Sequence, residues 1–152
     1  MSAIKNTGLP PPMKDPTANA AIARADKARK VKLPIPTESQ EQKWLFEWKF
    51  YARRTYPELA LLHAIPNGGF RNKVTAARLK AEGVCPGVPD LCLPVPRGGF
   101  YGLYIELKRR KGGKLSDDQA AWIRDLGRQG YCVKVCRGWE EAKDVIIGYL
   151  ES

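Results

Sequence analysis

Two strand-like segments with a very short link between them constrain the fold of this chain most. The segments are roughly Pro89–Val95 and Tyr101–Lys108, and the link is PRGG at residues 96–99. A link of this length cannot make a crossover, so the two strands should pair antiparallel as a hairpin. The hairpin should bring Asp90, at the start of the first strand, alongside Glu106 on the second.

Alternation along the second strand places Glu106 and Lys108 on one face and the aliphatic residues on the other. Because 28% of the residues are charged, one explanation is a solvated ion pair on the sheet surface. The other is a site in which Asp90 and Glu106 converge on one divalent cation. Mg²⁺ prefers carboxylate oxygens and keeps several waters. Lys108 would then orient an attacking water and offset charge that develops on a phosphate.

The remaining segments predict an α/β domain with a mixed central sheet flanked by helices. A helix should begin near Glu38, after an N-cap at Thr37, and end near Tyr56. The expected elements after it are a short strand within Leu59–Ile65, a helix at Lys73–Glu82, the hairpin, a helix from Ser116 to before Gly130, a strand at Tyr131–Cys136 and a helix at Trp139–Leu150. The expected buried faces of the first, third and last helices are Trp44, Leu45, Trp48 and Tyr51; Ala120, Ile123 and Leu126; and Ala142, Val145, Ile146 and Tyr149.

Residues 1–36 differ in composition from the rest of the chain. They contain six of the twelve prolines, and seven Lys and Arg residues against two Asp. We expect this segment to be a basic, disordered arm that contacts phosphates nonspecifically. Residues 37–152 are expected to form the folded domain.

The net charge of +10 and the pI of about 9.6 favour a polyanionic partner, either nucleic acid or a membrane surface. No run of 18 apolar residues could span a bilayer, and the N-terminus has no secretory signal. We therefore expect a cytoplasmic protein, in which thiols stay reduced. The four cysteines form no C-x-x-C pair, which favours small buried side chains over a zinc or iron–sulfur site.

Six motifs follow one another in the folded part: IPNGG, AARLKAEGV, GVPD, YIELK, LSDDQAAW and GYCVKVCRGWEEA. In this combination the chain closely resembles the VRR-NUC family, the virus-type replication-repair nucleases of the PD-(D/E)XK superfamily. The resemblance covers roughly Glu38 to Leu150. It implies a restriction-endonuclease-like core and cleavage of DNA that depends on Mg²⁺ or Mn²⁺.

The resemblance also implies roles for individual residues. Asp90 and Glu106 match the metal ligands, Lys108 the catalytic lysine, and Gln119 the glutamine that supports the site. An acid on the first helix completes the family's metal site. Glu38 is the better match, because Gln42 follows four residues later as in the family's E-x-x-x-Q pattern, and Glu41 is the alternative.

Basic residues near these motifs are the candidate DNA contacts. They are Arg71, Lys73, Arg78 and Lys80 after the PNGG turn, and Arg109, Arg110, Lys111 and Lys114 after the catalytic strand. Asn67 and the two glycines after it are expected to shape the DNA-facing rim.

Little in the chain suggests base-specific recognition, so we expect structure-selective cleavage of branched DNA such as Holliday junctions. Such a role fits phage or prophage replication, recombination or repair in a bacterial host. Two symmetric cuts would require a two-fold homodimer. The alternatives are a flap, single-strand or restriction-type nuclease on the same site, or a non-catalytic DNA-binding module.

Overall fold

A mixed sheet forms the centre of the structure, a computed structural model that describes residues 34–66 and 73–152. Its four strands in the described part, in spatial order, are β1 (His63–Ala64), β2 (Leu91–Leu93), β3 (Leu103–Lys108) and β4 (Cys132–Arg137). β2 pairs antiparallel with both β1 and β3, whereas β3 and β4 are parallel. The predicted hairpin and the predicted mixed sheet are both confirmed.

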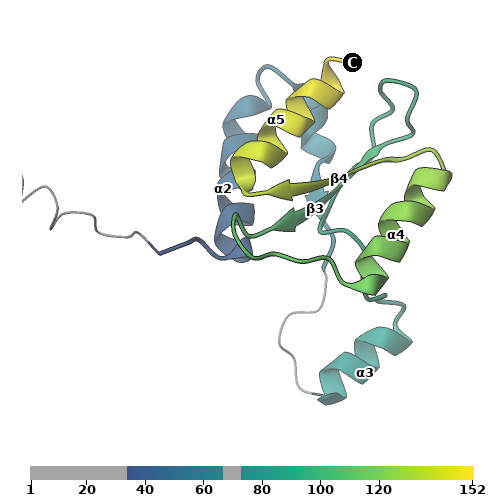
Figure 1. Cartoon of the computed structure of the whole chain (residues 1–152). Helices are drawn as coiled ribbons and strands as arrows, with labels where there is room; N and C mark the ends of the chain where they lie inside the picture. Colours follow the sequence, from purple (N-terminus) through teal and green to yellow (C-terminus); the bar gives the residue numbers. More distant parts are fainter. Residues whose placement is uncertain (1–33, 67–72) are drawn as a thin grey trace, which may run out of the picture. The chain divides into compact units, whose positions relative to one another are not determined.

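Helices lie on both faces of this sheet (Figure 1). α2 (Glu38–Ala52) and α5 (Trp139–Leu150) pack against each other and against β3. α4 (Asp117–Arg128) lies on the opposite face and packs against β4. Since β3 and β4 are parallel, the chain between them must make a crossover, and α4 is that crossover.

The hydrophobic core lies between the sheet and the pair formed by α2 and α5. The aliphatic side chains of β3 are buried there with Leu45 of α2 and Ile146 of α5. Burial of each such side chain contributes about 1.5–3 kcal/mol to folding. β3 therefore has one face fixed in the core, and its other face is left to carry Glu106 and Lys108.

Local hydrogen bonds set the ends of the helices as the sequence predicted. The Thr37 hydroxyl accepts from the Gln40 amide, so α2 begins at Glu38. At the other end of a helix, α3 (Lys73–Ala81) is followed by Gly83 with φ of +93°. The Gly83 and Val84 amides donate to the carbonyls of residues 80 and 79, which is a Schellman motif.

The structure differs from the prediction at the end of the first helix and at two residues that were expected to be buried. α2 ends at Ala52, and residues 57–61 form the 3₁₀ helix η1 (Pro57–Leu61), which leaves only two residues for β1. Tyr51 is 68% exposed because the buried line of α2 runs through residues 41, 45, 48 and 52. Ala120 of α4 is also exposed. The expected buried face of α5 is confirmed by Ala142, Ile146 and Tyr149, with Val145 partly buried against the core.

A search for membrane spans over the described residues finds no helix that is both long enough and apolar enough to cross a bilayer.

Candidate active site

The side chains that the sequence singled out for chemistry line one pocket of about 650 Å³. Asp90 comes from the segment before β2, Glu106 and Lys108 from β3, Gln119 from the first turn of α4, and Glu38 from the first turn of α2. Four separate parts of the chain thus bring carboxylates, an ammonium group and an amide to one cavity.

Glu106 and Lys108 are not a solvated pair on an open sheet surface. Their side chains are 1% and 9% exposed, and the Lys108 Nζ lies 2.9 Å from Glu106 Oε1. Two charges removed from water in this way are stable only if their hydrogen bonds are met and their partners are close. The burial therefore favours the site over the surface ion pair.

Gln119 holds the two charges together. Its side-chain amide donates to Glu106 Oε1, and its Oε1 accepts from Lys108 Nζ at 3.0 Å. The same oxygen accepts from the Ser116 amide at 3.0 Å, while the Ser116 hydroxyl accepts from the Gln119 amide. These two hydrogen bonds between Ser116 and Gln119 form the capping box of α4. Gln119 therefore caps the helix and also binds Glu106 and Lys108 in the pocket.

Asp90 is fixed against β3 by its own hydrogen bonds. The Leu107 amide donates to Asp90 Oδ2 at 2.8 Å, and the Ile65 amide donates to the Asp90 carbonyl at 2.7 Å. Gly87, three residues earlier, has φ of +84°, and a Cβ there would lie 2.5 Å from the Asp118 carbonyl carbon. The GVPD segment is therefore packed directly against the first turn of α4, next to Gln119.

The electrostatics of the pocket centre on Glu106. Burial, with smaller contributions from the nearby charges of Asp90 and Glu38, raises the pKa of Glu106, and Lys108 opposes the rise; the net value is about 7. Glu106 Oε2 is buried and has no hydrogen-bond partner among the described residues. A buried oxygen without a partner costs about 1–3 kcal/mol.

A divalent cation is a chemical fit to this arrangement. It would supply the missing partner of Glu106 Oε2 and would offset the repulsion between Glu106, Asp90 and Glu38. Within residues 34–66 and 73–152, no group of three or more His, Cys, Asp or Glu side chains is placed to hold a metal ion by itself. Mg²⁺ does not require one, because it is usually held by one or two carboxylates and keeps several waters.

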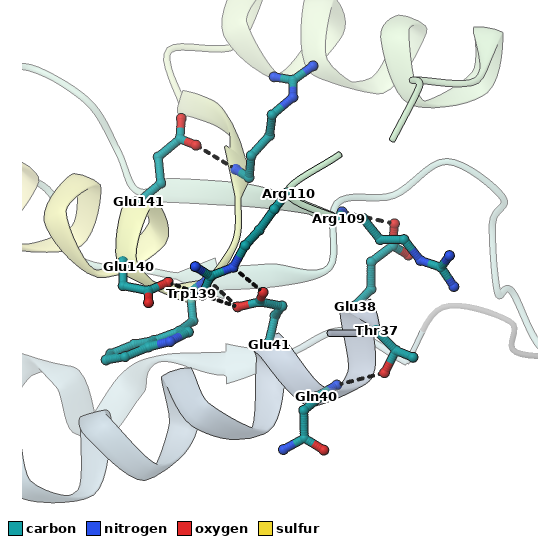
Figure 2. A network of polar contacts seen from close by, with 10 residues as sticks. Thr37, Glu38, Gln40, Glu41, Arg109, Arg110, Trp139, Glu140 and Glu141 are labelled. Carbon is teal, nitrogen blue, oxygen red and sulfur yellow. Dashed lines mark hydrogen bonds and ion pairs between the residues drawn. The ribbon is translucent and has the colours of Figure 1, made fainter. Parts of the chain in front are cut away.

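The two candidate acids of α2 lie in different surroundings (Figure 2). Glu38 lines the pocket, and its Oε1 accepts from the Arg109 amide at 3.4 Å. Glu41 is fully buried and is bonded instead to Arg110 and to the Trp139 amide. The geometry therefore favours Glu38 as the acid that faces the pocket.

The predicted DNA contacts are only partly described. Asn67 and Arg71 lie outside the described residues, as does the side chain of Lys73 at the start of α3. Arg78 and Lys80 are exposed on α3, and Arg78 pairs with Glu82. The basic residues on the segment between β3 and α4, namely Arg109, Arg110, Lys111 and Lys114, are all exposed.

Arg110 does not fit the prediction that it contacts phosphate. Its guanidinium group binds Glu41 and Glu140, so two carboxylates already neutralise it. The sequence shows a run of basic residues at 109–111 but gives no sign that one of them turns inward. That difference comes from the acids that α2 and α5 place beside it.

Sequence reasoning missed one wall of the pocket. Ser39, Lys43 and Phe46 of α2 line it beside Glu38 and Gln42. These three residues recur at helical spacing, four and then three positions apart, so they form a line on the helix. Glu38, Gln42 and Phe46 recur every four residues, and Ser39 and Lys43 each follow one position later, so this repeat was the available signal.

The mixed sheet flanked by helices has the restriction-endonuclease-like fold of the PD-(D/E)XK class. A model of the VRR-NUC domain matches residues 25–140 of the chain. The chain therefore belongs to the VRR-NUC family, which assigns it a nuclease-type function in DNA processing.

Comparison with solved structures agrees with this assignment. One solved structure, described as a VRR_NUC domain protein, superposes with a TM-score of 0.66 and 28% sequence identity. The alignment covers 78% of this chain and 92% of that one. No curated protein matches the chain.

In the absence of metal, stability is expected to fall as the pH rises from about 4.5 to about 7. Because the pKa of Glu106 is raised in the folded state, the folded protein binds more protons than the unfolded chain in this pH range. The free energy of unfolding therefore decreases as the pH rises and Glu106 ionises. The loss should be on the order of 1–3 kcal/mol, measured by urea unfolding in EDTA at several pH values.

The matched variants for this measurement are Glu106→Gln and Glu58→Gln. The first should remove most of the decrease, whereas Glu58→Gln should keep it, because Glu58 pairs with Arg97 away from the pocket. An equal pH slope in wild type and Glu106→Gln would show that Glu106 does not titrate in this range.

Proposed function

We propose that this protein is a Mg²⁺- or Mn²⁺-dependent endodeoxyribonuclease that hydrolyses phosphodiester bonds in branched DNA. The observation that carries the proposal is Glu106, a buried carboxylate with one oxygen unpartnered and with Asp90 and Lys108 beside it in an open pocket. In a module that only binds DNA, this arrangement would cost stability and serve no purpose. In a nuclease it is a ligand ready for a cation.

Each residue of the pocket has a role in this proposal. Asp90, Glu106 and Glu38 would hold the ion, which when bound polarises a phosphate oxygen and lowers the pKa of water. Lys108 has three N–H donors, and two are directed to Glu106 and Gln119. The third is available to a water or a phosphate oxygen. Gln119 keeps the ammonium group in place, and the reaction adds water across one P–O bond to leave a phosphate end and a hydroxyl end.

Basic residues around the pocket would bind the DNA backbone. Lys43 lines the pocket on α2, and Arg109, Lys111 and Lys114 are exposed on the segment that leads from β3 to α4. Their contacts should be to phosphates and independent of base sequence. The proposed further contacts, at positions 67, 71, 73, 78 and 80, rest on the sequence alone, as does a phosphate-binding role for the arm at 1–36 that precedes the nuclease domain at 37–152.

The absence of an evident base-reading element supports a preference for DNA shape over sequence. We therefore propose a homodimer that makes two symmetric cuts in a branched substrate, within the cytoplasm of a bacterial host and in phage or prophage DNA metabolism. A flap, single-strand or restriction-type nuclease is the second candidate, since the same pocket serves any of these substrates.

Purified protein should cut a four-way junction with Mg²⁺ or Mn²⁺ and should not cut it in EDTA. The measurement is a gel assay on end-labelled four-way, flap, nicked, linear and single-stranded DNA of one sequence. A preference for flap or single-stranded DNA would select the second candidate. Undiminished cleavage in EDTA would contradict metal dependence, and metal-independent binding without cleavage of any substrate would show a DNA-binding module.

A further inference from the structure

A network of ion pairs centred on the buried Glu41 joins α2 to Arg110 and to Glu140 (Figure 2). Arg110 Nε lies 2.6 Å from Glu41 Oε1, and its Nη2 lies 3.3 Å from Glu41 Oε2. The same guanidinium group binds Glu140 of α5 at 2.5 Å. The Trp139 amide donates to Glu41 Oε2 at 3.0 Å. One buried carboxylate thus joins α2, the chain just after β3, and the start of α5.

Glu41 is held in its charged form although it is fully buried. Burial opposes ionisation, but the hydrogen bonds from Arg110 and the Trp139 amide and the charge of Arg110 outweigh it and hold the pKa of Glu41 below its usual value. It also sits at the N-terminus of α5, where an anion is favoured by the helix dipole. The N-cap of α5, Gly138, makes no side-chain cap of its own, so Glu41 takes that place.

The network packs closely against Gly138 at the start of α5. Gly138 has φ of +92°, and a Cβ there would lie 3.2 Å from Arg110 Cγ and 3.4 Å from Glu41 Oε2. The Gly138 amide also donates to the Lys108 carbonyl at 3.1 Å. The network is therefore tied to the catalytic strand at Lys108 and Arg110.

The position of the network relative to Glu38 gives it a consequence for the site. Glu38 precedes Glu41 by three residues, so both lie on one side of α2. Glu38 accepts from the Arg109 amide, and Glu41 binds the side chain of the next residue. Two consecutive residues after β3 are therefore held by two acids one helical turn apart.

We propose that Glu41 and Arg110 are a positioning pair that fixes the first turn of α2 against the end of β3, so that Glu38 meets the same cation as Asp90 and Glu106. This inference rests on the proposed function, because it concerns the ion that the pocket would hold. Neither residue touches substrate; both act through Glu38. Residues that orient a metal ligand in this way typically change metal affinity by 10–100-fold when mutated.

The test is Mn²⁺ affinity of the full chain without DNA, measured from the electron paramagnetic resonance signal of free Mn²⁺. Arg110→Gln and Glu41→Gln should each weaken binding about 10-fold. The matched control is Glu58→Gln, which removes a comparable ion pair with Arg97, also 2.6 Å long. That variant should keep wild-type affinity even if its melting temperature falls. Arg110→Lys keeps the positive charge and can replace the other variants in this test if they fold poorly. It should lose part of the Mn²⁺ affinity.

A double-mutant cycle separates positioning from a general loss of stability. If Arg110 acts through Glu38, then Arg110→Gln should add little further loss to Glu38→Gln, whereas independent effects would multiply. Full Mn²⁺ affinity in folded Arg110→Gln with weakened DNA binding would overturn the inference and make Arg110 a DNA contact. Asp90→Asn tests the proposed metal site itself. If this variant binds Mn²⁺ as tightly as wild type, both the proposed function and this inference are wrong.

Discussion

Replacing Asp90 by asparagine is expected to lower DNA cleavage at least about 1,000-fold and leave the fold intact. A metal ion contributes several kcal/mol of charge stabilisation in the transition state, and about 1.4 kcal/mol corresponds to ten-fold in rate. Asparagine removes the charge that would hold the ion. It keeps an oxygen that can accept from the Leu107 amide, as Asp90 Oδ2 does at 2.8 Å.

Cleavage should be measured under single-turnover conditions on the preferred DNA substrate, with melting temperature and DNA affinity measured in parallel. Asp144→Asn is a suitable control, because Asp144 is an exposed acid on α5 that pairs with Lys143. It should cleave at the wild-type rate. Comparable rates for Asp90→Asn and wild type would rule out Asp90 as a metal ligand and remove the basis of the proposed mechanism.

Replacing Lys108 by methionine should reduce the cleavage rate about 100- to 1,000-fold without weakening Mn²⁺ binding. Methionine retains most of the aliphatic stem. That stem is packed: a Cβ on Gly113 would lie 3.0 Å from the Lys108 Cβ. The substitution therefore removes the ammonium group and preserves the shape. Loss of a positive charge beside Glu106 and Asp90 should maintain or increase the attraction for a cation.

The distinguishing result is a slow enzyme that still binds metal, which separates Lys108→Met from Asp90→Asn. Lys111→Met provides the comparison, since Lys111 is exposed three residues further on. It should weaken DNA binding slightly and reduce its salt dependence, with little change in the rate of the bound complex. If Lys108→Met cleaves as fast as Lys111→Met, Lys108 has no role in the chemistry.

The fold was largely predictable where the local chemistry is strong. The short link at 96–99 required the hairpin, Ser116 marked the start of α4, and Gly83 marked the end of α3. The apolar run at 59–65 was not predictable in the same way. Leu59 and Leu62 are three residues apart, a spacing that suits a 3₁₀ helix, but short apolar runs fit a strand equally well until the surface that buries them is known.

The candidate site was also predictable in part. Strand alternation placed Glu106 and Lys108 on one face, and hairpin pairing placed Asp90 beside them, because both follow from backbone geometry. Neither rule predicts whether that face of the sheet is exposed to solvent or buried under another element. The burial of both charges and the raised pKa of Glu106 depend on α4, which reaches this face only through the crossover to β4.

The sequence by itself determined the hairpin, the start of α2 and the end of α3, because each depends on residues that are close along the chain. Only the tertiary structure placed Glu38 on the pocket and Glu41 against Arg110. The placement of Glu41 rests on contacts between residues about 70 to 100 positions apart, with Arg110 and with Trp139. Side chains of one type on one helix or loop are alike in sequence, and they acquire different charges, burial and roles only when distant elements pack beside them.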